Sequence, residues 1–377
     1  MKSRNHPENL DVDRFMRRYW QREPLLLRHA FAGFRDPLSP AEVLALSGSP
    51  DAAARLVAKR GRTWSLEHGP FDARRLARLP PRDWTVLVQD TNHFSPRAAA
   101  LLGCFDFIPH ARVDDVMVSY AVPGGSVGPH VDSYDVFLLQ GHGRRRWQIS
   151  RQRDIAFVPG VPLKILERFV PEEEWTLEAG DMLYLPPGVA HHGVAETECL
   201  TWSIGFRAPS DDELARGFLD YVQDSVALEG HYADPGAAPA RHPGEVPAAM
   251  LTHAERVIDR IRWRRGDVRD FAGCFLSEPK AQVYFQPPHR PLARAEFARS
   301  GARAGIALDA KSRLLFSGTI FFMNGERAPV APAARAGMRQ LADRRVLPGP
   351  LDLPREFWEA AHEWYVLGYL GLQRGKG

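Results

Sequence analysis

The sequence predicts an α+β protein in which a double-sheet β-barrel precedes a helical segment and a small winged-helix-like unit. Short apolar runs separated by Pro and Gly fill the region from Trp84 to Phe206, as in barrels and sandwiches. After residue 210 the apolar spacing becomes helical. A hairpin pattern then stands near the C-terminus. With 377 residues, the chain is long enough for two or three packed units.

Composition excludes several classes of protein. Hydrophobic residues make up 44% of the chain and charged residues 25%, as in ordinary globular proteins. No apolar stretch is long enough to cross a bilayer, and the N-terminus lacks the features of a secretory signal. Cys104, Cys199 and Cys274 are widely separated, which favours a reducing cytoplasm over a disulfide framework or zinc cage. A net charge of +3 is small, so we expect no membrane partner and no direct nucleic-acid binding.

The N-terminal part alternates short helices with one strand before the barrel begins. Helical spacing over 11–20 ends before Pro24, and Leu25-Leu26-Leu27 has the pattern of a short buried strand. Two further short helices are expected over 40–47 and 71–79. The barrel strands then follow at 84–88, 116–122, 136–140, 146–149, 175–177, 182–185 and 200–206.

Two helices follow the barrel. Ser210 and Glu213 form a capping box at the start of the first helix, and a second helix follows over 250–261 after a loop rich in Ala, Gly and Pro. Their apolar faces form an oligomer interface or pack on the barrel, and the pattern leaves both open. The predicted domains are a catalytic barrel at 1–208, a helical dimerisation segment at 209–285 and a winged-helix-like domain at 286–377.

The C-terminal part mixes helix and strand. Asn324-Gly325 follows the apolar run 319–323 and is the strongest hairpin signal in the chain. A closing helix is expected from Phe357 to Leu367, where apolar residues recur at helical spacing. A hairpin wing beside helices predicts a winged-helix-like fold.

A histidine and an acid in the middle of the barrel region point to a metal site. His130 and Asp132 are two residues apart, so on a strand both side chains project from the same face. They supply two ligands of a non-haem Fe(II) facial triad, which needs one more histidine and leaves three coordination positions open.

A third ligand is expected after a Pro-Pro-Gly turn. The run from Pro186 to His192 follows an apolar strand, so its histidines stand at the mouth of the barrel. His191 and His192 cannot both point inward if the chain is extended there. Spacing alone does not choose between them.

These motifs resemble the JmjC-type 2-oxoglutarate oxygenases, and most closely the bacterial arginine hydroxylases of ribosomal protein uL16. The resemblance implies a double-stranded β-helix (cupin/JmjC) barrel, Fe(II), and 2-oxoglutarate and O2 as co-substrates. It also implies that His191, at the end of the Pro-Pro-Gly-x-x-His run, is the distal ligand. It is carried by the segments 19–26, 115–125, 128–137, 143–147, 184–188 and 205–209.

The resemblance also assigns residues around the metal. Arg145 matches the position of the basic anchor for the far carboxylate of 2-oxoglutarate, and a guanidinium can hold a carboxylate with two hydrogen bonds. Arg144 and Arg146 should point the other way on a strand. The resemblance also places the Ser119 hydroxyl near the co-substrate, and strand parity after the distal histidine offers Thr201 as a second hydroxyl near the far carboxylate.

The substrate implied by the resemblance is an arginine of uL16, hydroxylated on its β-carbon by a homodimeric enzyme. Asp115, Met117 and Tyr134 resemble the family's contacts to that arginine, with an acid for the guanidinium and an apolar sleeve around it. The same chemistry on a His or Asn of another protein is the first alternative, and Asp115 discriminates because a neutral target needs no acid. A non-enzymatic cupin sensor joined to a winged helix is the second.

Overall fold

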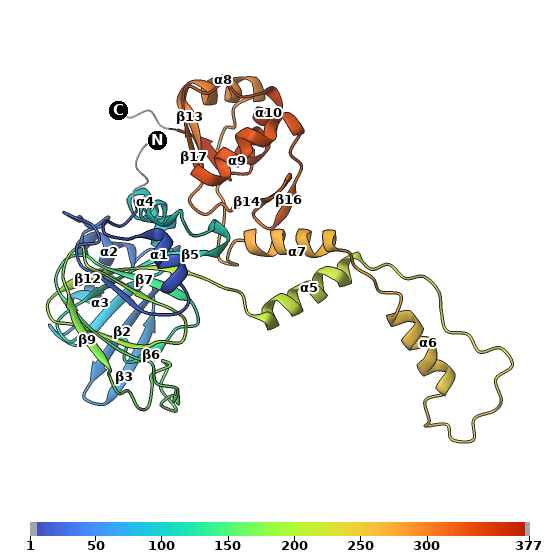
Figure 1. The fold of residues 1–377 in the computed structure, drawn as a ribbon, viewed down its shortest axis with the longest axis horizontal. Coiled ribbons are helices and arrows are strands. Elements are labelled where there is room, and N and C mark those ends of the chain that lie inside the picture. The colour runs from blue at the N-terminus through green and yellow to red at the C-terminus, as the bar shows by residue number, and fades with distance from the viewer. Residues whose placement is uncertain (1–5, 374–377) are drawn as a thin grey trace. The chain divides into compact units, whose positions relative to one another are not determined.

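The computed structural model describes residues 6–373, which divide into two compact units after Ala208. The first unit is rich in strands and the second in helices (Figure 1). No helix among the described residues is long and apolar enough to cross a membrane.

The first unit consists of two antiparallel sheets that face each other across an apolar layer. The larger sheet has the order β1-β10-β7-β12-β5-β4-β2-β3, and the smaller has the order β6-β11-β8-β9. This arrangement confirms the predicted double-sheet barrel. The strands of the larger sheet, in that order, are Leu25–Leu27, Met182–Leu185, Asp135–Gln140, Cys199–Phe206, Val113–Ala121, Trp84–Val88, Ala54–Arg60 and Thr63–His68. Those of the smaller sheet are His130–Val131, Ala190–Ala195, Arg145–Ser150 and Glu173–Leu177.

Strand alternation gives the large sheet two different faces. On β7, Val136 and Leu138 point toward the smaller sheet, whereas Phe137 and Leu139 point to the outer core. Helices cover that outer face, and Phe105 lies 4.6 Å from Phe137 between ring centroids. The helices of this unit are α1 (Val12–Arg18), α2 (Pro40–Leu46), α3 (Ala73–Ala77) and α4 (Pro96–Leu102). The barrel interior is therefore reserved for the inward-pointing residues of both sheets.

Besides the two-residue strand β6, three strands of this unit were not predicted. The hairpin of β2 and β3 extends the large sheet, with Ala54 and Leu56 in the outer core and Arg55 on the opposite face. The apolar run of β2 is only three residues long, from Leu56 to Ala58, and charged residues stand on both sides of it, so its strand pattern is weak. The third is β11, whose Ala-His-His-Gly sequence has low β-propensity and is held by its pairing with β8.

The second unit begins with three helices, α5 (Asp211–Ser225), α6 (Ala248–Ile258) and α7 (Arg265–Ser277). The predicted capping box is present, because Ser210 Oγ accepts from the Glu213 amide and the Glu213 carboxylate accepts from the Ser210 amide. Helix α7 was not predicted. Its Phe271 ring lies 5.4 Å from the Phe218 ring of α5.

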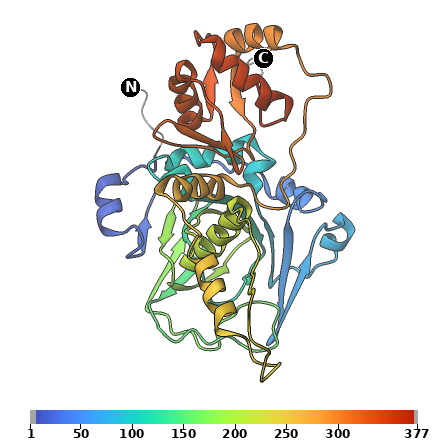
Figure 2. The ribbon, with the colours of Figure 1, turned by 90° about the vertical axis from the view of Figure 1, so that its right-hand side faces the viewer.

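The rest of the second unit is a winged-helix fold with its own core (Figure 2). Helix α7 contacts the three-stranded sheet β14-β15-β16, and a second sheet has the order β17-β13-β18. The predicted Asn324-Gly325 turn joins β15 to β16, which confirms the hairpin. The elements are α8 (Arg294–Ala304), β13 (Gly305–Leu308), β14 (Leu314–Ser317), β15 (Ile320–Met323), β16 (Glu326–Ala328), α9 (Arg335–Arg344), β17 (Val346–Pro348), α10 (Arg355–Val366) and β18 (Leu370–Leu372).

Candidate active site

Two strands of the small sheet and the turn after one of them bring His130, Asp132 and His191 together. His191 on β11 pairs in register with His130 on β6. Asp132 Oδ2 lies 3.6 Å from His191 Nε2 and 3.9 Å from His130 Nε2. Among residues 6–373, this is the only group of three or more His, Cys, Asp or Glu with ligand atoms close enough to share a metal ion.

Hydrogen bonds to backbone carbonyls orient both imidazoles. His130 Nδ1 donates to the Gly128 carbonyl, and His191 Nδ1 donates to the Val189 carbonyl, each at 3.0 Å. Each Nε2 therefore keeps its lone pair for a metal. Burial, with a smaller effect from His130, lowers the pKa of His191 to about 4, so this imidazole is neutral at pH 7. Two imidazoles and one carboxylate fit the facial triad of a non-haem iron site.

His192 lies outside this group. It follows His191 on β11, and its side chain contacts Phe169 with 6.1 Å between ring centroids. Burial, followed by the positive charge of Arg145, lowers the pKa of His192 to about 4. The structure thus separates the two histidines that sequence spacing left open.

Arg145 projects from β8 into the barrel and is 3% exposed. Its guanidinium donates to Ser119 Oγ at 3.0 Å and to the Gly193 carbonyl at 3.3 Å, and it lies over the Trp147 ring. Within the described chain it forms no ion pair with a carboxylate, and burial lowers its pKa.

Two buried donors in this pocket have no partner among the described residues: Arg145 Nε and Trp147 Nε1. An unpaired buried cation is costly unless an anion joins it. The pocket therefore fits the far carboxylate of a keto-diacid such as 2-oxoglutarate.

The small sheet sets the spacing between this pocket and the metal ligands. On β11, His191 pairs with Ile149 of β8, and Ala195 pairs with Arg145. Four residues of strand separate the pairs, which is about 13 Å along the sheet before the side chains turn inward. Gly193 lies between them, and a Cβ there would be 2.7 Å from the Trp147 ring. Glycine at this position keeps room for the two side chains that line the pocket.

The two predicted hydroxyl residues lie side by side. Thr201 on β12 pairs with Ser119 on β5, and both point into the barrel. Arg145 Nη1 is 3.5 Å from Thr201 Oγ1, which itself donates to Gln140 Oε1 at 3.1 Å. Gln140 and Trp147 were not predicted as site residues. A signal for Gln140 was available, because it continues the inward parity of two apolar residues on the same strand.

The three predicted substrate contacts share the barrel interior with the metal ligands. Asp115 and Met117 have the same parity as Ser119 on β5, and Asp115 accepts a hydrogen bond from the Asp90 amide. Tyr134 packs against the inner apolar layer. Burial and the charges of Asp132 and Asp115 raise the pKa of Tyr134 above its usual range. Tyr134 therefore stands within electrostatic reach of the metal ligand Asp132 and of Asp115.

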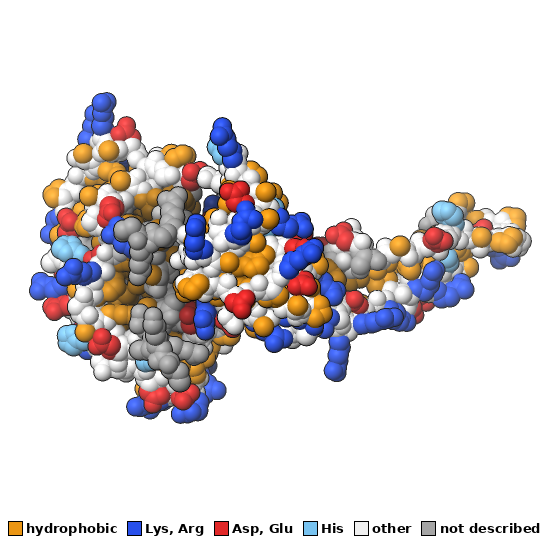
Figure 3. Space-filling model, turned by 90° about the horizontal axis from the view of Figure 1, so that it is seen from above, with side chains coloured by type: hydrophobic (Ala, Val, Ile, Leu, Met, Phe, Trp, Pro, Cys, Tyr) orange, Lys and Arg blue, Asp and Glu red, His pale blue; other side chains and the backbone are white. Residues whose placement is uncertain are grey.

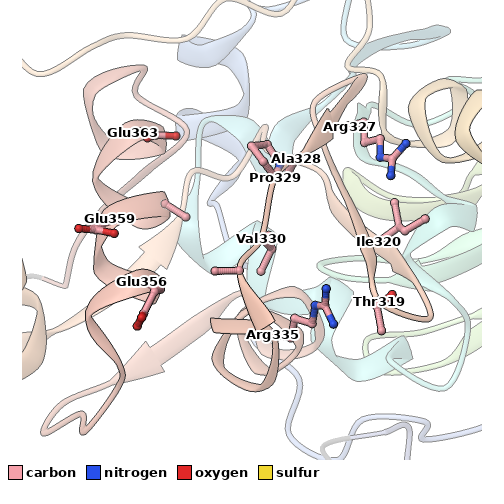
Figure 4. Close-up of a pocket in the computed structure, with 12 residues that line it drawn as sticks. Thr319, Ile320, Arg327, Ala328, Pro329, Val330, Arg335, Glu356, Glu359 and Glu363 are labelled. Carbon is pink, nitrogen blue, oxygen red and sulfur yellow. The ribbon is translucent and has the colours of Figure 1, made fainter. Parts of the chain in front are cut away.

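The winged-helix unit has a groove of about 990 Å³ (Figure 4). Glu356, Glu359 and Glu363 of α10 line one wall, and Arg327 and Arg335 line another. Its lining residues include no histidine or cysteine. The groove therefore lacks the nitrogen and sulfur ligands of a transition-metal site.

Two family models match the chain. The model of the JmjC domain matches residues 100–214, and that of the ROXA-like winged helix matches residues 260–371. The first range contains all nine predicted site residues.

Curated proteins and solved structures agree with these matches. Ribosomal protein uL16 3-hydroxylase of Escherichia coli is 35% identical over 85% of this chain and 87% of its own length. A probable ribosomal oxygenase of Haemophilus influenzae is 39% identical over 58% of this chain and 56% of its own length. The structure of YcfD, a ribosomal oxygenase from Escherichia coli, in complex with cobalt and 2-oxoglutarate has a TM-score of 0.82 at 32% identity, covering 98% of this chain and 99% of that one.

Proposed function

Because this chain belongs to the JmjC family of 2-oxoglutarate-dependent ribosomal oxygenases, we propose that it hydroxylates the β-carbon of an arginine in ribosomal protein uL16. The observation that carries the proposal is the placement of His130, Asp132 and His191 beside the unpaired Arg145 pocket. The name of the Escherichia coli relative supports the substrate. Ribosomal proteins are made in the cytoplasm of bacteria, which is where we place the reaction.

His130, Asp132 and His191 would hold Fe(II), and Arg145 would hold the far carboxylate of 2-oxoglutarate. When bound, iron and 2-oxoglutarate together convert O2 into an oxidant that inserts one oxygen atom into a C–H bond, with release of succinate and CO2. The carbonyl partners of the two imidazoles keep Nε2 directed at the metal. The Ser119 hydroxyl supports Arg145 and can donate its own proton to the carboxylate.

Asp115, Met117 and Tyr134 would bind the target arginine. A carboxylate in a partly dry channel pairs with the guanidinium and offsets the loss of its hydration. The thioether and the phenol ring flank the aliphatic stem, because arginine carries an apolar stem below its charged head. The β-carbon lies at the base of that stem, so the acid orients the substrate at a distance from the reacting bond.

The test incubates the protein with Fe(II), 2-oxoglutarate and a uL16 peptide, and measures the product by mass spectrometry. We expect the mass of one added oxygen atom on arginine, and its loss in His130→Ala. Asp115→Asn should raise the KM for the peptide about 30-fold or more and leave the KM for 2-oxoglutarate unchanged. Hydroxylation of His or Asn instead, unaffected by Asp115→Asn, would replace the arginine assignment. Absence of succinate release under every condition would contradict the enzymatic reading.

We also propose that residues 209–285 form a homodimer interface. Leu219, Met250, Leu251 and Ile258 of α5 and α6 are 42–64% exposed. Such apolar faces are stabilised when a second copy covers them. Sedimentation of the full chain should give a dimer, and Leu251→Glu with Ile258→Glu should shift it to a monomer.

Direct nucleic-acid binding is not part of the proposal. Helix α10 carries three glutamates along the groove of the winged-helix unit, which would repel phosphate groups. On the face shown in Figure 3, Lys and Arg side chains are interspersed with Asp and Glu. Salt-dependent DNA binding by the full chain would revive the sensor alternative.

A further inference from the structure

Gln140 is completely buried at the end of β7, inside the barrel. Gln140 pairs with Thr201 of β12, and Thr201 pairs on its other side with Ser119 of β5. The three residues therefore form one row across β7, β12 and β5. All three side chains lie on the inner face, below the guanidinium of Arg145. This row therefore lines the pocket beneath the Arg145 guanidinium.

Hydrogen bonding fixes the direction of each group in the row. Gln140 Nε2 donates to the carbonyls of Leu200 at 3.0 Å and His142 at 3.2 Å, so its amide cannot turn over without losing both bonds. Its oxygen therefore faces Thr201 and accepts the hydroxyl proton at 3.1 Å. A hydroxyl has one proton, so Thr201 offers only lone pairs to Arg145.

The same amide links the β7–β8 turn to the pocket. His142 belongs to that turn. The turn leads into β8, the strand that contains Arg145. Gln140 thus holds the start of Arg145's strand and the hydroxyl beneath its guanidinium. Ser119 differs, because it accepts from Arg145 and no acceptor for its own proton is found in the described part of the chain.

We propose that Gln140 is a positioning residue for co-substrate binding: by taking the Thr201 proton, it makes Thr201 a fixed acceptor that orients Arg145 toward the carboxylate of 2-oxoglutarate. Thr201 then supports the anchor, and Ser119 is the hydroxyl that donates to the carboxylate. This inference rests on the proposed co-substrate pocket around Arg145.

The experiment measures the dissociation constant of 2-oxoglutarate by calorimetry on the full chain loaded with Mn(II), without O2. Gln140→Met keeps length and volume and removes the amide, and Thr201→Val removes the hydroxyl. Each should weaken binding about tenfold: Thr201→Val removes an acceptor of the charged Arg145 guanidinium, and Gln140→Met removes the acceptor that fixes the Thr201 hydroxyl. The double variant should be no weaker than either single variant, because both changes break the same link. In the hydroxylation assay, KM for 2-oxoglutarate should rise in all three while kcat changes little.

Gln148→Met is the matched control. Gln148 is on the same strand as Arg145, but its side chain has the opposite parity and donates to Glu174. Its affinity for 2-oxoglutarate should equal that of the wild type.

A second variant, Gln140→Glu, keeps the inference testable if Gln140→Met does not fold. In Gln140→Glu, burial favours the neutral acid, which keeps a carbonyl oxygen for Thr201 and one O–H donor. It should bind 2-oxoglutarate within about threefold of the wild type.

Three outcomes would overturn the inference: wild-type affinity in Gln140→Met, multiplied effects in the double variant, or a loss in Gln140→Glu as large as in Gln140→Met. Failure of the wild type itself to bind 2-oxoglutarate would instead contradict the proposed function.

Discussion

Replacing Arg145 with methionine should abolish co-substrate binding and change the stability of the ligand-free fold by no more than about 2 kcal/mol. The guanidinium is 3% exposed and has no carboxylate partner among the described residues. Replacing a buried ion pair with apolar residues of similar volume can stabilise a protein by about 1–4 kcal/mol, and a buried guanidinium without a carboxylate partner lacks even the attraction within such a pair. Loss of the bonds to Ser119 and Gly193 removes about 1 kcal/mol each. The net change is therefore about −1 to +2 kcal/mol in favour of the variant.

Differential scanning calorimetry measures both effects. A change of that size shifts the Tm of a unit of this length by between about −4 and +8 °C. Added 2-oxoglutarate at about 100 times its dissociation constant stabilises the Mn(II)-loaded wild type by roughly 2.7 kcal/mol, and should not shift the Arg145→Met transition.

Arg146→Met is the control. Arg146 is exposed, pairs with Glu174 at 3.1 Å and points away from the pocket, so its replacement should change stability by less than about 1 kcal/mol and keep the ligand response. A Tm more than about 5 °C lower in Arg145→Met, or a persisting shift with 2-oxoglutarate, would refute the assignment of this pocket.

Three other predictions address the metal, the pocket wall and the barrel's support. His191→Ala should lose bound metal and all product by mass spectrometry, whereas His192→Ala should keep stoichiometric metal; metal loss in both would show that the two are not distinguished. Gly193→Ala should raise the KM for 2-oxoglutarate and lower the free energy of unfolding by about 1–3 kcal/mol, because its Cβ meets the Trp147 ring. Asp135→Ala should lower the free energy of unfolding in urea by about 3–5 kcal/mol, because a buried carboxylate holds an arginine and a phenol hydroxyl; a change below 1 kcal/mol would contradict this.

Apolar spacing predicted most barrel strands and the hairpin wing, because these elements carry their burial pattern in their own residues. It failed for β2, where Arg55 alternates with core residues, and for β11, whose Ala-His-His-Gly sequence is strand only because two neighbours pair with it. It also missed α7. Pairing with strands distant in the sequence determines β2 and β11. The residues of one segment do not show which other segments it will pair with.

The residue types in the sequence predicted the metal ligands better than they predicted the pocket around Arg145. His130 and Asp132 stand two residues apart in a strand pattern, so their convergence follows from local geometry. The choice of His191 over His192 depended on resemblance, and the structure shows that register with His130 separates them. Strand parity places Gln140 inside the barrel, but its role in the pocket depends on Thr201, which lies 61 residues away, so the sequence alone does not reveal that role.

The run of three arginines at β8 shows how the fold selects one of them. Inward and outward positions alternate, so a slip of one residue would bury Arg144 and Arg146 and expose Arg145. The turn before β8 prevents this. Gly143 adopts a φ of 73° and packs so closely on the Glu198 carbonyl that no Cβ fits, while the Gln140 amide binds the carbonyl of the preceding residue. Specificity for the diacid therefore depends on a turn that never touches it, and a substitution there should reduce 2-oxoglutarate affinity before it affects metal binding.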